Sequence, residues 1–281
     1  MITALVTGGT GFVGSHVARV LVQRGYGVRI LRRTTSRLDA IADLDCEHAI
    51  GDVMDPESLT AAMQGVDWVF HTAAVADYWR NDPARIYAVN VDGTRNVLLA
   101  AEAAGVKRVI FTSSAAAMGY RTDLRPVDES VRFNFDQHIT PYGHSNFLAE
   151  AEVYRAIRRG LDCVILNPTV IIGPGDLNQI SSSVVVEAAR GNVPPTAPPG
   201  GVTLIDVRDV AEAHVAAAER GRTGERYLLG AVDLTHKAWL RLTAHTVGRS
   251  RMAVTLPAPL VRGVAVAADV GADPAAGLGR E

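Results

Sequence analysis

The chain has 281 residues, of which 48% are hydrophobic and 21% are charged, and its formal net charge is −2. This composition is ordinary for a globular protein, and so small a net charge excludes an overall field that would attract nucleic acid or an anionic membrane surface. The two cysteines, Cys46 and Cys163, lie far apart in the sequence, which excludes a disulfide framework and a cysteine-based metal site.

The ends and the apolar runs of the sequence bear on its location. The first residues lack the basic region and the long apolar core of a signal peptide, and no run of about 18 apolar residues could span a membrane. We therefore expect a cytoplasmic protein that binds no metal, no nucleic acid and no membrane.

Short apolar runs alternate with segments of helical periodicity over the first two-thirds of the chain. Two helix boundaries have a clear cause. Asp55 caps the helix that starts at Pro56, and Gly25 ends the helix at residues 13–24. The apolar runs predict strands at residues 2–6, 28–31, 46–50, 68–71, 108–113 and 163–168. The periodic segments predict helices at residues 13–24, 56–65, 83–105 and 142–160.

This alternation indicates a fold class. Apolar strands that alternate with helices form a parallel sheet covered on both faces. Right-handed crossovers make such a sheet doubly wound, and its ligands bind beyond the carboxyl ends of the strands. The sequence therefore predicts a Rossmann-type α/β fold, whose functional residues immediately follow the strands.

The pattern loosens in the last third of the chain. The prolines and glycines of residues 191–201 predict a loop or hinge, whereas residues 202–221 predict a strand and a helix that return to the main domain. Residues 257–281 show one short helical stretch and no clear core.

These segments divide the chain into two expected domains. We expect a Rossmann domain that binds NAD(P), formed by residues 1–168 together with 202–230. A small C-terminal substrate lobe would comprise residues 169–201 and 231–281.

A glycine-rich loop lies between the first strand and the first helix. Gly8 permits a turn that other residues resist, Gly11 lets the backbone approach a pyrophosphate, and Gly14 allows close packing of helix on strand. The free amides at the helix start would then bind phosphate. Because the flanking strands and helix fit this pattern, it predicts a dinucleotide site. The other loop residues expected to contact the cofactor are Thr7, Phe12 and Val13.

The end of the second strand bears on the choice between NAD and NADP. NAD sites usually carry an acidic residue there for the ribose 2′-hydroxyl, whereas this chain has Arg32 and Arg33. Arginine instead offers a planar fork to a 2′-phosphate. We therefore expect NADP in preference to NAD. The alternative is that both arginines are solvated loop charges.

Segments near the predicted strand ends follow a familiar order. They are TGGTGFVG (7–14), GD (51–52), HTAA (71–74), NVDGTRN (90–96), TSS (112–114), PYGHSNFLAE (141–150), NPTVIIGP (167–174) and DVRDVAEAH (206–214). Over roughly residues 1–256 the chain resembles the extended branch of the short-chain dehydrogenase/reductase superfamily. Within that branch it is most similar to dihydroflavonol-reductase-like proteins and to hopanoid-associated sugar-epimerase-like proteins.

The resemblance implies further cofactor contacts. Asp52, after the third strand, would meet the adenine amine, and Val53 would help to pack the ring. Ala73 and Ala74, after the fourth strand, would leave room for the cofactor, and Pro168 would contact its nicotinamide end. An ordinary loop acid is the alternative interpretation of Asp52.

The resemblance also implies two catalytic hydroxyl groups. Ser114 would hydrogen-bond the reacting oxygen, and Tyr142 would be the general acid or base. Ser113 is disfavoured, because side-chain alternation turns it toward the packed side. The alternative role for Ser114 is a strand-end hydroxyl that satisfies backbone groups. We interpret His71 and Asn90 as structural.

The chain departs from the family pattern after its tyrosine. The family has a lysine four residues later, where this chain has Asn146, on the same helix face as Tyr142. The lysine's implied tasks are to hold the nicotinamide ribose and to lower the pKa of the tyrosine. Asn146 can still hydrogen-bond a ribose hydroxyl but brings no charge. Neither Lys107 nor Lys237 is an obvious substitute.

This departure favours one direction of reaction. Free tyrosine has a pKa of about 10, so Tyr142 should stay protonated at neutral pH without a neighbouring cation. A protonated tyrosine can donate to a carbonyl oxygen as the carbon accepts hydride, but it is a poor base for alcohol oxidation. We therefore expect carbonyl reduction.

Aromatic side chains predict an apolar or ring-bearing substrate rather than a bare sugar nucleotide. The alternative is that Trp79 and Phe133 close the small core of the substrate lobe. The expected substrate contacts are Tyr78, Trp79, the loop 120–140 with Phe133, Phe135 and His138, and the segment after Pro174.

We therefore expect an NAD(P)-dependent oxidoreductase that reduces an aldehyde or ketone of a small metabolite. The alternatives are an epimerase or dehydratase of a nucleotide sugar, which would hold NAD tightly, and a non-catalytic NADP-binding protein. The resemblance also implies a homodimer that pairs through the helices at 83–105 and 142–160.

Overall fold

The computed structural model describes residues 1–76, 82–123, 125–136, 138, 140–179, 181–192, 196–249, 254–255 and 257. Tyr78, Trp79 and most of the segment 257–281 therefore lie outside the described residues. The chain divides into two compact units. Unit 1 comprises residues 1–180 and 205–231, and unit 2 comprises residues 181–204 and 232–281.

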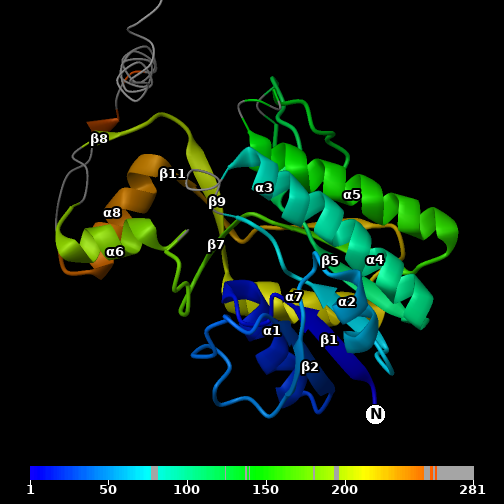
Figure 1. Ribbon diagram of the computed structural model, residues 1–281. Coiled ribbons are helices and arrows are strands. Elements are labelled where there is room, and N and C mark those ends of the chain that lie inside the picture. Colours follow the sequence, from blue (N-terminus) through cyan, green and yellow to red (C-terminus); the bar gives the residue numbers. More distant parts are fainter. Residues whose placement is uncertain are drawn as a thin grey trace, which may run out of the picture. The chain divides into compact units, whose positions relative to one another are not determined.

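Unit 1 contains a seven-stranded sheet in the order β10-β6-β5-β4-β1-β2-β3 (Figure 1). Every pair of neighbouring strands is parallel. The order reverses between β1 and β4, which is the switch point where a doubly wound sheet binds its ligand. The strands are β1 (Thr3–Thr7), β2 (Gly27–Arg32), β3 (Glu47–Ile50), β4 (Trp68–His71), β5 (Arg108–Thr112), β6 (Cys163–Pro168) and β10 (Arg226–Leu229).

Helices cover both faces of this sheet (Figure 1). Side chains alternate between two cores: Leu5 packs with α2, α4 and α5, whereas Ala4 and Val6 pack with α1 and α7. Because both faces of the central strands are buried, their middle residues are almost wholly apolar, whereas the edge strand β3 is mostly exposed. The helices are α1 (Phe12–Gln23), α2 (Pro56–Ala62), α3 (Pro83–Tyr87), α4 (Gly93–Ala104), α5 (Pro141–Arg159) and α7 (Val207–Arg220).

The predicted doubly wound Rossmann-type fold is confirmed. The six predicted strands all occur, each within one residue of its predicted ends. Asp55 caps α2 as expected, because its side chain accepts hydrogen bonds from the amides of Glu57 and Ser58.

The predicted helix over 83–105 is confirmed as an unbroken helical segment from Pro83 to Ala104, but it contains a π-helical turn that was not predicted. A π-helical turn, η1 (Ala88–Asp92), separates α3 from α4. Within it, the carbonyl of Asn90 accepts a hydrogen bond from the Thr94 hydroxyl at 2.6 Å, and the Asn90 side chain bonds both backbone groups of Val75. The π turn therefore coincides with the side-chain contacts of Asn90.

The segment 202–230 is shared between the units. α7 and β10 lie in unit 1, whereas β9 (Gly201–Asp206) pairs antiparallel with β11 (Val232–Thr235). Three short elements of unit 1 were not predicted: η2 (Ala115–Ala117), β7 (Val170–Ile172) and β10.

Unit 2 has a small core of its own. Ala188 and Ala244 are buried there, with Leu240 and Val247 packed against them. Its other elements are α6 (Ser183–Arg190), β8 (Thr196–Ala197), α8 (His236–Thr246) and β12 (Val254–Thr255).

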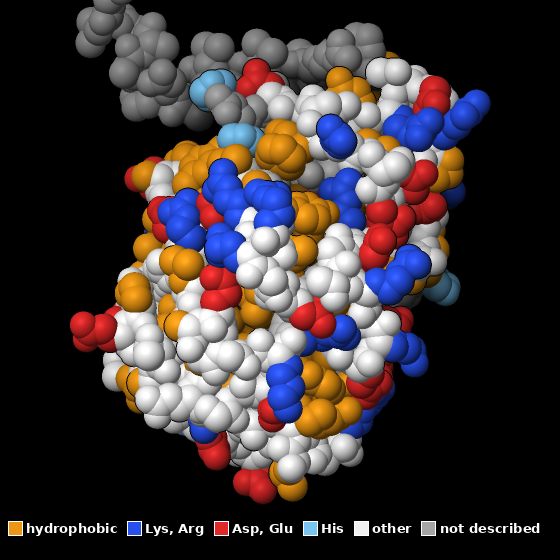
Figure 2. All heavy atoms as spheres, turned by 90° about the vertical axis from the view of Figure 1, so that its right-hand side faces the viewer, with side chains coloured by type: hydrophobic (Ala, Val, Ile, Leu, Met, Phe, Trp, Pro, Cys, Tyr) orange, Lys and Arg blue, Asp and Glu red, His pale blue; other side chains and the backbone are white. Residues whose placement is uncertain are grey.

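Two features of the surface and the helices bear on partners. On the face shown in Figure 2, several basic side chains gather in the upper left, while basic and acidic side chains alternate on the right, with patches of hydrophobic side chains between them. Among the described residues, no helix is long and apolar enough to cross a membrane.

Candidate functional site

The glycine-rich loop follows β1 and leaves no room for side chains. Gly8 has φ +69°, and a Cβ on it would lie 2.8 Å from the backbone nitrogen of Ala73. A Cβ on Gly14 would lie 2.6 Å from the hydroxyl of Thr72. The backbones of β1, β4 and α1 therefore approach one another more closely than any larger residue permits.

The positive end of α1 is open to an anion. Gly11 is its N-cap, so no side chain accepts a hydrogen bond from the first amides, and no acidic residue lies in the first turn. Unsatisfied amides and the helix dipole together favour a phosphate at this point. Thr7 is buried at the end of β1, while Phe12 and Val13, in the first turn, are partly exposed.

A buried histidine connects the ends of the two central strands. Nδ1 of His71 lies 2.7 Å from the Thr7 hydroxyl, and its Nε2 lies 3.0 Å from the hydroxyl of Thr94. Burial lowers the pKa of His71 to about 4, so the ring is neutral at physiological pH. His71 therefore has the structural role expected from the sequence.

The two arginines after β2 differ in their surroundings. Nε of Arg32 donates to Nδ1 of His48 on β3 at 2.7 Å. Arg33 is exposed, and its guanidinium has no hydrogen-bond or ion-pair partner within the described part of the chain. The Arg33 backbone is fixed in a turn, because its amide donates to the Ser36 hydroxyl at 3.0 Å. An exposed guanidinium on a fixed backbone is well suited to bind a 2′-phosphate.

The residues that follow β3 and β4 differ in how deeply they are buried. Oδ1 of Asp52 accepts from the amide of Met54 at 3.0 Å, and Val53 is buried in the core between the sheet and α4. Ala73 is partly buried beside Gly8 and Ala74 is exposed.

The two serines after β5 have opposite orientations, as side-chain alternation predicts. Ser113 is buried, and its hydroxyl donates to Oε1 of Glu150 at 2.6 Å. Ser114 is only partly buried and caps η2, because its Oγ accepts from the amide of Ala116 at 3.1 Å. The Ser114 O–H has no acceptor among the described residues, so it can donate to a ligand oxygen.

Tyr142 and Asn146 lie in the first two turns of α5. Tyr142 is partly buried. Asn146 is buried, and its Nδ2 donates to the backbone carbonyl of Tyr142 at 2.9 Å. The amide that replaces the family's lysine is thus directed back along its own helix and supplies no positive charge.

The aromatic residues of the loop 120–140 pack largely on one another. Phe133 stacks on Phe147 of α5, with ring centroids 5.3 Å apart, and Phe135 lies 5.9 Å from Phe133. This packing gives Phe133 a structural role in unit 1 rather than in the lobe core considered above. Phe135 is 40% exposed and His138 is exposed, so both can meet a ligand.

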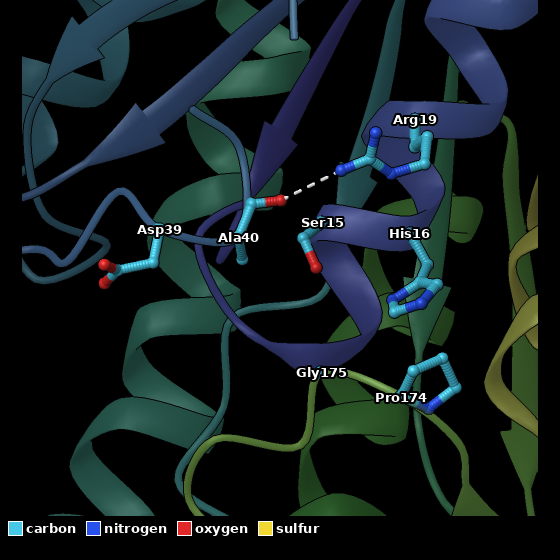
Figure 3. A pocket seen from close by; sticks show the side chains of 7 residues that line it. All are labelled: Ser15, His16, Arg19, Asp39, Ala40, Pro174 and Gly175. Carbon is cyan, nitrogen blue, oxygen red and sulfur yellow. Dashed lines mark hydrogen bonds between the residues drawn. The ribbon is translucent and has the colours of Figure 1, made fainter. Parts of the chain in front are cut away.

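A cavity of about 240 Å³ lies beside α1 (Figure 3). His16 and Arg19 line it from the helix, but both are engaged: His16 Nδ1 bonds the carbonyl of Phe12, and Arg19 bonds Asp43 and the carbonyl of Ala40. Nothing in the sequence indicated this cavity. Its walls are formed by Ser15, His16, Arg19, Asp39, Ala40, Pro174 and Gly175.

Among the described residues, no group of three or more histidine, cysteine or carboxylate side chains could hold a metal ion.

Pro168, the predicted nicotinamide contact, is the buried last residue of β6.

Comparison with known proteins decides the family. Residues 4–230 match the family described as NAD dependent epimerase/dehydratase. The chain belongs to this family.

Several relatives are similar over most of their length. A Synechocystis sp. protein named as a dihydroflavonol 4-reductase is 38% identical over 258 residues, which cover 90% of this chain and 73% of that protein. Sterol demethylase protein B of Methylococcus capsulatus is 33% identical over 268 residues, with coverage of 95% and 81%. Cinnamoyl-CoA reductase 1 of Oryza sativa is 36% identical over 254 residues, with coverage of 84% and 73%.

Solved structures share the fold. The crystal structure of gox2253 has a TM-score of 0.88 and 39% identity, covering 97% of this chain and 83% of that one. The UDP-glucose 4-epimerase of Thermus thermophilus, in complex with NAD, has a TM-score of 0.78 and 24% identity, covering 99% and 95%. The resemblance to extended short-chain dehydrogenases/reductases is thereby confirmed, and the chain is an NAD(P)-dependent oxidoreductase.

Proposed function

We propose that the protein is an NADP-dependent reductase that acts on the carbonyl group of an apolar, ring-bearing small molecule. The observation that carries this proposal is the position of Asn146, whose amide bonds the Tyr142 carbonyl and leaves the tyrosine without the lysine charge of the family. A tyrosine that keeps its proton is suited to donate it, which is the proton movement that carbonyl reduction requires.

The residues present fit a dinucleotide. Side chains are sterically excluded at Gly8 and Gly14, and the uncapped start of α1 provides amides for the pyrophosphate. Asp52, Val53, Ala73 and Ala74 would line the adenine side, and Pro168 would face the nicotinamide. When bound, the reduced nicotinamide supplies the hydride for the carbonyl carbon.

NADP is favoured over NAD by the arginine pair. The exposed guanidinium of Arg33 would meet the 2′-phosphate, and Arg32 would support it from its hydrogen bond with His48. No acidic side chain takes the usual place of a ribose 2′-hydroxyl acceptor at the end of β2.

Two hydroxyl groups would act on the substrate oxygen. Ser114 would donate a hydrogen bond that polarises the carbonyl, and Tyr142 would donate its proton as negative charge develops on the oxygen. Asn146 would hold Tyr142 only through the helix backbone. Because Asn146 brings no charge, the reverse step, removal of a proton from an alcohol, would be slow near neutral pH.

The relatives' names support the substrate class. Dihydroflavonol 4-reductase and cinnamoyl-CoA reductase are named for substrates that contain aromatic rings, and Phe135 leaves an exposed aromatic surface on the loop 120–140 of this chain.

The proposal is tested by NADPH oxidation with a panel of ring-bearing aldehydes and ketones. We expect turnover with NADPH, at least tenfold weaker binding of NADH, and alcohol oxidation that becomes measurable only at alkaline pH. Equal rates of oxidation and reduction at pH 7 with saturating substrates, or a preference for NADH, would contradict the proposal. Binding of NADPH without turnover of any carbonyl would favour a non-catalytic cofactor-binding protein.

An epimerase or dehydratase of a nucleotide sugar is the second candidate. The description of the family names both reactions. This route begins with oxidation of the sugar and retains its cofactor, so purification of the protein with NAD bound would favour it.

We also propose a homodimer that pairs through α4 and α5. Leu99 on α4 is 48% exposed and Phe147 on α5 is 37% exposed, and a second copy would cover them. A monomeric mass in solution at micromolar concentration would contradict this.

A further inference from the structure

A buried polar cluster lies behind the proposed catalytic serine, on the side away from the cofactor loop. It joins residues from four elements of unit 1: Ser113 after β5, Glu150 on α5, Asn167 on β6 and Arg226 on β10. Three of these side chains are at most 5% exposed, and the side chain of Arg226 is 14% exposed. The proposed reaction assigns none of them a role.

Glu150 is the centre of this cluster. Its Oε1 accepts from the hydroxyl of Ser113 and from Nδ2 of Asn167, each at 2.6 Å. Its Oε2 faces Nη1 of Arg226 at 3.3 Å. Glu150 follows Asn146 by four residues and so lies one turn further along the same helix face as Tyr142 and Asn146. One carboxylate therefore connects the helix of the tyrosine to the strand end of the serine.

Asn167 carries this connection to Ser114 itself. Its Nδ2 also donates to the backbone carbonyl of Ser114 at 2.9 Å. Its Oδ1, by contrast, is buried without a hydrogen-bond partner among the described residues. An unsatisfied buried acceptor costs free energy, so selection for stability alone does not explain this asparagine. Nδ2 of Asn167 thus donates to Ser114 and Glu150, whereas Oδ1 accepts no hydrogen bond among the described residues.

Arg226 extends the cluster to the loop 120–140. Its Nε donates to the carbonyl of Glu129 at 2.8 Å, and its Nη2 donates to the carbonyl of Val131 at 2.6 Å. The Glu129 side chain in turn accepts at 2.9 Å from the amide of Leu228, which lies beyond Arg226 on β10. A planar guanidinium offers five N–H donors in a fixed geometry, so Arg226 can bond Glu129, Val131 and Glu150 at once. Arg226, which pairs with Glu150, therefore also hydrogen-bonds the backbone of the loop that carries Phe133 and Phe135.

We propose that Arg226 and Glu150 are positioning residues, which set the distance between the hydroxyls of Ser114 and Tyr142 and the place of the loop 120–140. The assignment of Ser114 and Tyr142 as the catalytic pair rests on the function proposed above. Neither Arg226 nor Glu150 touches the reacting atoms. Their effect is exerted through Asn167, the Ser114 backbone and the carbonyls of residues 129 and 131.

The test uses Glu150→Gln, Arg226→Met and the double variant that combines them. Each single variant leaves one buried charge without its partner, which lowers stability, whereas the double variant leaves none. We expect the unfolding temperature to fall in both single variants and to recover in the double variant. We expect kcat to stay about 10- to 100-fold low in all three. The Kd for NADPH should change little, because the loop that binds the pyrophosphate follows β1, which β4 separates from the strands of the cluster.

A matched control exists at the opposite end of the same strands. Arg108 at the start of β5 and Asp162 before β6 form a partly buried pair, with Nη2 and Oδ2 2.7 Å apart. Arg108→Met with Asp162→Asn should change stability without changing kcat. Recovery of kcat together with stability in the Glu150→Gln, Arg226→Met double variant would overturn the proposal, because the pair would then be merely structural.

A second measurement is independent of the reaction. If the wild-type protein reduces no carbonyl, the proposed function fails, but the cluster is still tested by amide hydrogen exchange. The double variant should exchange faster at residues 114–118 and 128–132, with unchanged protection over residues 3–23. Unchanged exchange in those two segments would overturn the positioning role.

Discussion

Two buried histidines make the stability of the protein depend on pH. His71 bonds the hydroxyls of Thr7 and Thr94, and His214 on α7 bonds the Thr112 hydroxyl at 2.7 Å and the Val210 carbonyl at 2.7 Å. Burial lowers the pKa of each to about 4, against about 6.5 in an unfolded chain. Between these two values the unfolded state binds more protons than the folded state, so stability falls as pH decreases.

The magnitude follows from the two pKa values. From pH 7.5 to pH 5, each histidine should cost about 2 kcal/mol of unfolding free energy, because the unfolded imidazole is almost fully protonated at pH 5 and the folded one is not. His71 and His214 share no partner, so their effects should add to about 4 kcal/mol. Carboxylates with lowered pKa values, such as Asp123 at about 2, titrate mainly below this window.

The assay is urea unfolding at pH 7.5 and pH 5 for the wild type, His71→Gln and His214→Gln. Each variant should be less stable at pH 7.5, but its loss of stability on acidification should be about 2 kcal/mol smaller than that of the wild type. His245→Gln, which replaces an exposed histidine, is the control. An equal loss on acidification in all four proteins would refute the reasoning.

Three further predictions concern the proposed site. Arg33→Ala should raise the Kd for NADPH about 10- to 100-fold by removing a charge-assisted contact, with little change for NADH; a parallel loss for both cofactors in a binding titration would contradict its assignment to the 2′-phosphate. Gly14→Ala should lower the unfolding temperature and weaken NADPH binding, because a Cβ there would lie 2.6 Å from the Thr72 hydroxyl, whereas Gly27→Ala, with its nearest atom at 3.4 Å, should do neither. Asn146→Lys should make alcohol oxidation measurable closer to pH 7 by favouring the tyrosinate; a pH–rate profile for oxidation identical to that of the wild type would count against the proposed effect of Asn146.

The sequence predicted the central sheet because its information is local. Buried parallel strands are continuous apolar runs, and caps such as Asp55 mark helix starts within a few residues. The glycine loop was equally predictable, since Gly8 and Gly14 are required by close approaches that occur in every fold of this type.

Features that depend on distant contacts were not predictable. The π turn between α3 and α4 coincides with the bonds of Asn90 with Val75, fifteen residues away in sequence. β10 is a half-buried edge strand of four residues, and an apolar run as short as Tyr227–Leu229 does not by itself distinguish a strand from a helix.

The candidate site also contains features that the sequence predicts and features that depend on distant contacts. The replacement of the family lysine by Asn146 was visible in the sequence, but the bond of its amide with the Tyr142 carbonyl was not. Arg226 and Glu150 are 76 residues apart, and no spacing rule joins them. The different surroundings of Arg32 and Arg33 likewise depend on His48, which lies on a neighbouring strand.

The central claim is that Tyr142 donates a proton while NADPH reduces a carbonyl. Its most direct test compares the wild type with Tyr142→Phe in single-turnover oxidation of bound NADPH by a ring-bearing aldehyde or ketone. We predict hydride transfer in the wild type and a rate lower by about 10²- to 10⁴-fold in the variant, with the same Kd for NADPH. Equal rates in the two proteins, or no hydride transfer from NADPH that is demonstrably bound to the wild type, would contradict the claim.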